Sequence, residues 1–66
     1  MRADKEKIEM VMARKCMNIS AIVKASGMPA PSVKNVMYGR GVNPYTLGKF
    51  CKALGVDPAE IIAKED

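Results

Sequence analysis

Positively charged side chains that have no acidic neighbour are the most chemically distinctive feature of this sequence. The stretch between Met10 and Val56 contains no Asp or Glu, and its seven bases are Arg14, Lys15, Lys24, Lys34, Arg40, Lys49 and Lys52. The net charge is 0 over residues 1–9, +7 over residues 10–56 and −3 over residues 57–66. A positive field of this kind favours a polyanionic partner. The alternative is a solvated basic surface that only keeps the protein soluble.

The same inventory of residue types argues against catalysis and metal binding. The chain has no His and no carboxylate in its middle block, so general acid–base pairs and activated nucleophiles lack the groups they need. Its two cysteines, Cys16 and Cys51, cannot alone complete a tetrahedral metal site. Both lie within apolar patterns, and we expect them to be buried free thiols. We therefore expect a protein that is not an enzyme and that has no cofactor and no metal.

Length and hydropathy limit the architecture to one small domain. The 66 residues are 48% hydrophobic, which is enough for a single core, so the predicted domain spans residues 1–66. No apolar run approaches the roughly 18 residues that cross a membrane, and the N-terminus shows no signal-peptide pattern. We expect no membrane association and a cytoplasmic location.

Apolar residues recur at helical spacing in five short segments, which capping and helix-breaking residues separate. Asn18 and Asp57 have side chains that can cap a helix, and Pro58 with Glu60 completes the pattern of a capping box. Gly27 can end a helix because glycine tolerates positive φ. No segment alternates at the period of a strand, so the predicted fold class is all-α. The predicted helices cover residues 5 to 15 or 16, 19–25, 30–38 and 44–54, followed by a last helix that begins at Pro58.

Residues 18–38 have the arrangement of a helix-turn-helix. A predicted helix, a short turn that contains Gly27 and a second helix follow one another there. In such a unit the second helix enters the major groove of DNA with its exposed side chains. Glycine-containing corners are common among helical hairpins, so the pattern alone is only moderately specific.

The run from Asn18 to Gly41 resembles the helix-turn-helix of the phage repressor and Cro type, the XRE-like family. The most specific part of the resemblance, which covers about residues 7–62, is the stretch Lys52-Ala53-Leu54-Gly55-Val56. The resemblance implies a compact five-helix, repressor-like DNA-binding domain. The implied function is that of a bacterial or phage-encoded transcriptional regulator. It would bind double-stranded DNA sequence-specifically as a homodimer, with residues 30–38 in the major groove.

The family positions imply roles for individual residues of this chain. Asn35 is the best candidate for hydrogen bonds to a base, since its amide can bind adenine through two hydrogen bonds. The residues that match base-reading positions or lie beside them are Ala30, Pro31, Ser32, Lys34 and Asn35. The residues implied to contact phosphate are Asn18, Lys24, Tyr38, Arg40, Asn43 and Tyr45. The implied dimer interface lies at the last helix and the loop before it, at Val56, Asp57 and Ile61.

Some of these residues can instead have a purely structural role. Asn18 and Asn43 can be helix caps and nothing else. Lys24 can be a solvated helix residue, and both tyrosines can be packing residues. We expect Lys49 and Lys52 on an outer face of the fourth helix and assign them no role.

Two departures from the family pattern affect the expected chemistry. Many members have an Arg and a Glu that pair inside the domain where this chain has Met12 and Met37. An apolar pair can replace a buried ion pair without desolvating charges, so we predict that the two methionines touch. Pro29, Ala30 and Pro31 stand where a polar first turn is usual. We expect poor hydrogen-bond readout there and a larger part for thymine methyl groups and DNA shape.

The apolar first turn and the acidic C-terminal segment also suggest an alternative function. A helix-turn-helix scaffold can bind another protein, as an antitoxin-like or antirepressor-like module does. Affinity for DNA that falls steeply with salt favours the DNA-binding function, whereas absence of DNA binding at low salt favours the protein-binding one.

Overall fold

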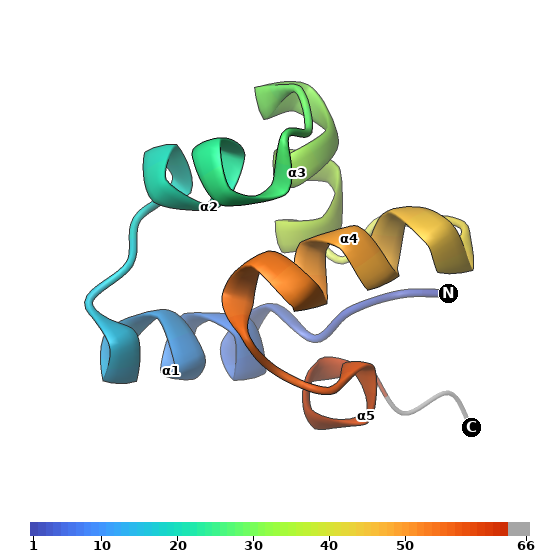
Figure 1. Ribbon diagram of the computed structural model, residues 1–66. Coiled ribbons are helices and arrows are strands. Elements are labelled where there is room, and N and C mark those ends of the chain that lie inside the picture. The colour runs from blue at the N-terminus through green and yellow to red at the C-terminus, as the bar shows by residue number, and fades with distance from the viewer. Residues whose placement is uncertain (64–66) are drawn as a thin grey trace.

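Five helices make up most of the described part of the chain, residues 1–63, in the computed structural model (Figure 1). Their bounds are α1 Lys5–Lys15, α2 Ile19–Ser26, α3 Ala30–Met37, α4 Pro44–Leu54 and α5 Pro58–Ile61. The predicted all-α class is confirmed, and the helix boundaries lie close to the predicted ones. Within residues 1–63, no helix combines the length and the hydropathy needed to cross a membrane. Lys64, Glu65 and Asp66, which contribute to the predicted acidic end, lie outside the described residues.

Local capping explains the start of α5 and the ends of α2 and α4. Asp57 and Glu60 form the predicted capping box of α5, in which Glu60 Oε2 accepts a hydrogen bond from the Asp57 amide at 2.9 Å. Gly27 and Gly55 end α2 and α4 with φ of +69° and +78°. This left-handed conformation is strained for residues that have a Cβ, so glycine is favoured at both positions.

The core lies where the five helices meet. α2 packs against both α3 and α4, while α5 packs against α1 and α4. The orientation of α3 is therefore fixed by apolar contacts on the side opposite its exposed residues. The largest fully buried side chains are those of Phe50, Ile8, Ile22, Leu47, Leu54, Ile61, Val33, Val36 and Cys51.

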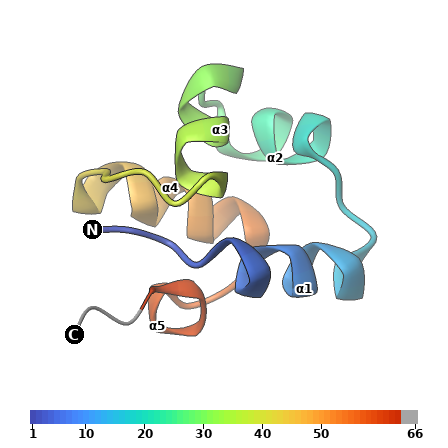
Figure 2. The same ribbon diagram turned by 180° about the vertical axis from the view of Figure 1, so that it is seen from behind.

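The segment before α1 is extended and lies between the end of α5 and the connection from α3 to α4 (Figure 2). The Asp4 amide donates a hydrogen bond to the Ile61 carbonyl at 2.7 Å. On the other side, the Val42 amide donates one to the Met1 carbonyl at 2.8 Å. Ala3 between them is 3% exposed. This segment therefore ties the start of α1 to two distant parts of the chain, which helical periodicity did not predict.

The two cysteines lie in different environments. Cys51 is 1% exposed within the core, as predicted. Cys16 is exposed, so the expectation that both thiols are buried is wrong for this residue. The physical reason is that α1 ends at Lys15, and Cys16 caps it in the left-handed conformation with φ of +51°, outside the buried stripe of the helix. Among the described residues, no three His, Cys, Asp or Glu side chains gather as metal ligands would.

Candidate nucleic-acid interface

A tight turn joins α2 to α3 and sets the start of α3. Gly27 adopts positive φ, and Ser26 Oγ accepts a hydrogen bond from the Met28 amide at 3.1 Å. Met28 is 5% exposed, so its side chain anchors the turn in the core. Pro29 precedes α3 in an extended conformation and provides no side-chain cap. Pro31 has no N–H to donate, so the first turn offers few hydrogen-bond donors to a ligand.

α3 separates its buried residues from those predicted to read bases. Val33 and Val36 are fully buried and Met37 is nearly so. The side chains of Pro31 and Lys34 are exposed. The remaining predicted base-reading residues, Ala30, Ser32 and Asn35, are half-buried. All five are thus accessible from solvent on a helix whose other face is held by the core.

Asn35 and Arg40 form a pair that sequence analysis treated as two independent residues. Arg40 Nη1 donates a hydrogen bond to Asn35 Oδ1 at 2.9 Å, and the Arg40 amide donates one to the Asn35 carbonyl at 3.1 Å. An adenine bound through two hydrogen bonds would need the same Asn35 oxygen as an acceptor. The side chain of Asn35 is therefore already engaged by Arg40.

Both tyrosines are exposed, and each has a lysine over its ring. Tyr38 is 56% exposed, with Lys5 Nζ 5.7 Å from the ring centroid. Tyr45 is 74% exposed, with Lys49 Nζ 5.5 Å from the ring centroid. The alternative that these tyrosines are packing residues is wrong. Lys49, which was expected to have no role, lies beside a residue implied to contact phosphate.

Asn18 and Asn43 both act as helix caps. Asn18 Oδ1 accepts a hydrogen bond from the Ala21 amide at 2.9 Å, and Asn43 Oδ1 accepts one from the Thr46 amide at 2.7 Å. Each cap uses the amide oxygen, so capping leaves the two Nδ2 donors available for an anion. Both side chains are exposed at the start of a helix, where the helix dipole also favours negative charge.

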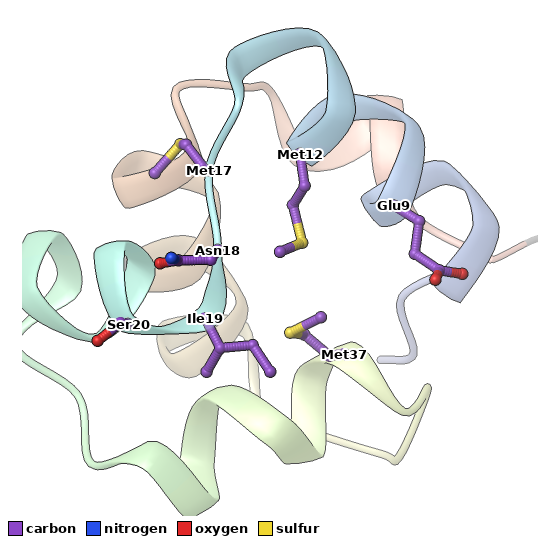
Figure 3. A pocket seen from close by; sticks show the side chains of 7 residues that line it. All are labelled: Glu9, Met12, Met17, Asn18, Ile19, Ser20 and Met37. Atoms are coloured by element: carbon purple, nitrogen blue, oxygen red, sulfur yellow. The ribbon is translucent and has the colours of Figure 1, made fainter.

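A shallow groove lies between α1, the start of α2 and the end of α3 (Figure 3). Met12 and Met37 point toward one another across it, and Ile19 and Met17 line it as well. Met37 is 8% exposed, and Met12 is partly buried against the same core. The structure therefore places Met12 and Met37, which were predicted to touch, on facing sides of the same groove.

The predicted dimer interface is wrong at Ile61. Its side chain is fully buried in the core, so it cannot contact a second subunit without leaving that core. Val56 is half-buried and Asp57 is exposed, and both line a shallow depression that Pro58 also lines. These two residues keep the accessibility that an interface requires.

Lys15 stabilises the end of α4, a role that sequence analysis missed. Its Nζ donates hydrogen bonds to the Leu54 carbonyl at 2.7 Å and to the Gly55 carbonyl at 3.1 Å. A cation at this place meets the negative end of the helix dipole and carbonyls that have no partner within the helix. Gly55 signals the helix end in the sequence, but nothing local indicates which lysine approaches it.

Comparison with known families decides the class of this helix-turn-helix. Residues 7–66 match the family described as the Cro/C1-type HTH DNA-binding domain. The chain belongs to this family. The Cro/C1-type domain is thus a DNA-binding domain of a kind that regulates transcription and that is typically not enzymatic. No match was found among curated proteins or among solved structures.

Proposed function

We propose that this Cro/C1-type domain is a transcriptional regulator that recognises specific sequences in double-stranded DNA, with α3 in the major groove. The observation that carries the proposal is the accessible face of α3, which has basic residues on it and beside it. The side chains proposed to lie near base edges are those of Ala30, Pro31, Ser32, Lys34 and Asn35. Because the first turn lacks polar side chains, contact with thymine methyl groups supplies much of the discrimination there.

Residues around α3 contact the phosphates that border the groove. The Nδ2 donors of Asn18 and Asn43 and the first amides of α2 and α4 bind one phosphate each. Charge and hydroxyl donors on the same side add to these contacts. The residues that supply them are Lys24, Tyr38, Arg40 and Tyr45.

Two copies of the domain bind DNA together as a homodimer. The protein is encoded by a bacterial or phage gene and acts in the bacterial cytoplasm. Half-sites on one side of a duplex are about 34 Å apart, one helical turn. The domain measures 33 × 23 × 17 Å, so two copies side by side can place their α3 helices at that separation. Val56 and Asp57 are the proposed contacts between them.

Titration of the domain with mixed genomic DNA fragments at several salt concentrations tests the first part of this proposal. We expect affinity to fall steeply as salt rises, because bound phosphates release counterions. Selection of bound sites from a random DNA pool tests specificity and should enrich a motif with two-fold symmetry. Absence of binding at the lowest salt would instead favour the helix-turn-helix-fold module that binds another protein. Binding without enrichment would refute sequence-specific recognition.

A further inference from the structure

A cluster of four side chains at the C-terminal end of α3 joins three separate parts of the chain. Lys5 comes from the first turn of α1, and Arg40 comes from the loop before α4. Both approach the ring of Tyr38, with Lys5 Nζ 5.7 Å and Arg40 Cζ 5.9 Å from its centroid. Asn35 holds the guanidinium of Arg40 through the 2.9 Å hydrogen bond. Two exposed cations are thereby gathered around one aromatic ring.

The backbone fixes Lys5 in this position. The Ala3 carbonyl oxygen lies 3.2 Å from the place where a Cβ on Gly39 would stand, so the two backbones are in close approach. The Val42 amide donates its hydrogen bond to the Met1 carbonyl in the same region. The start of α1 is therefore held against the end of α3, which fixes the backbone from which the Lys5 side chain reaches Tyr38.

The contacts of Arg40 leave it able to bind an anion. The side chain of Asn35 and the ring of Tyr38 are both neutral, so they orient the guanidinium without neutralising it. An arginine has five N–H donors, and the bond to Asn35 uses one of them. Lys5 adds three more donors from the other part of the cluster. Both cations approach the same ring, so an anion beside Tyr38 is attracted by both.

We propose that Lys5, Tyr38 and Arg40 form one binding site for a backbone phosphate of DNA, in which Asn35 is a positioning residue that holds Arg40. This inference rests on the proposed function, because α3 in the major groove brings the sugar-phosphate strand past its end. Successive phosphates of one strand are spaced by about 3.4 Å along the axis of the duplex. A strand that passes the end of α3 therefore brings a phosphate close to the site. α1 becomes part of the interface, although the first nine residues have no net charge.

Binding of a fluorescent duplex of mixed sequence at a series of salt concentrations tests the contribution of Lys5. Lys5→Ala should reduce the magnitude of the salt slope by about 1 and weaken binding roughly fivefold near 0.1 M salt, because one phosphate contact is lost. Lys5→Arg should restore both values. Lys52→Ala is the matched control, since it also removes one exposed positive charge but lies on α4.

The same assay tests the positioning role of Asn35. Asn35→Ala removes no charge, yet it should reduce the salt slope as Arg40→Ala does, because Arg40 loses its hydrogen-bond partner. The double variant should have the same salt slope as Arg40→Ala alone. Met10→Ala, a neutral truncation at an exposed position of α1, should leave the slope unchanged.

The outcomes separate this inference from the proposed function. If the wild-type domain binds and Lys5→Ala behaves like Lys52→Ala, Lys5 acts only through net charge and the site is refuted. An unchanged slope for Asn35→Ala refutes the positioning role. If the wild-type domain binds no DNA even at the lowest salt, the proposed function fails and the phosphate site fails with it. Thermal unfolding of each variant by circular dichroism establishes that the compared proteins are folded.

Discussion

Burial gives the two cysteine thiols opposite chemistry. Desolvation in the core, followed by the nearby carboxylates of Asp57 and Glu60, raises the pKa of the Cys51 thiol from 9.0 to about 11. Cys51 is therefore neutral and shielded near neutral pH, whereas Cys16 is exposed to reagents. A thiol must ionise to react as a nucleophile. Only one of the two thiols is available for modification in the folded domain.

The raised pKa of Cys51 predicts a loss of stability in alkaline solution. The folded pKa of about 11 lies above the ordinary value of 9.0, so the unfolded thiol loses its proton first. The stabilisation is fully present below about pH 9 and is lost as pH rises toward 11. In urea unfolding over this range, Cys51→Ala should lose less stability than the wild type. Cys16→Ala is the control and should keep the wild-type dependence of stability on pH. The same dependence on pH in all three proteins would contradict the prediction.

The helix caps at two asparagines could be predicted from the sequence, whereas the hydrogen bond at a third could not. The caps at Asn18 and Asn43 involve amides three residues further on, so local sequence sufficed to expect them. The bond from Arg40 to Asn35 depends on how the chain turns after α3, where Gly39 has φ of +72°. A residue pattern does not specify that turn. Candidates for base-reading and phosphate-binding residues could be named, but the hydrogen bond between Asn35 and Arg40 could not be predicted.

The end of α4 is held by a residue from another helix. Lys15, the last residue of α1, donates to the carbonyls of Leu54 and Gly55, so it links α1 to α4 as well as capping the latter. Charged capping of this kind typically contributes about 1 kcal/mol. One of the seven bases of the acid-free block is thus used for stability rather than for phosphate.

Lys15→Ala should therefore destabilise the domain by about 1 kcal/mol, measured by urea unfolding at low salt. The carbonyls at the end of α4 would lose their charged donor. Arg14→Ala, which removes the same charge from the preceding exposed position, should cost much less. A larger effect of Arg14→Ala than of Lys15→Ala would overturn this assignment.

Helices and their ends could be predicted because their signals are local. Asp57 and Glu60 predicted the start of α5, and Gly55 predicted the end of α4. The extended segment before α1 gave no such signal. Its hydrogen bonds reach Ile61 and Val42, which are distant in sequence, and only tertiary structure brings them together.

The acidic residues at the start of α5 lie far from α3 in the fold. α3 and α5 lie on opposite sides of the fold (Figure 1). Asp57 and Glu60 therefore lie away from the side that we propose for DNA, and they do not oppose phosphate there. We expect the acidic end of the sequence, residues 57–66, to point away from DNA, and Asp57 and Glu60 are the two acids of that end that lie within the described residues. The residues of a dimer interface could not be predicted from the sequence. Ile61 was assigned to that interface, but its side chain is buried in the core.

Val56→Thr should weaken the proposed dimer. The added hydroxyl remains hydrated at a half-buried surface position of the monomer but loses water in an interface. We expect the dimer dissociation constant from sedimentation equilibrium to rise roughly tenfold, which corresponds to the low end of the cost of burying an unpaired hydroxyl. Val42→Thr, also half-buried but in the connection before α4, is the control. Identical dissociation constants for both variants and the wild type would exclude Val56 from the contact.

The pairing of Ala3 with Ile62 has a consequence for the order in which the chain folds. α2, α3 and α4 are neighbours in sequence, so their contacts close short loops and form early. The bridge between Ala3 and Ile62 closes a loop that includes nearly the whole described chain and forms after them. Lys5 reaches Tyr38 through a different closure, the one between Met1 and Val42. A folding chain is therefore expected to pack α3 against α2 and α4 before its two ends are joined.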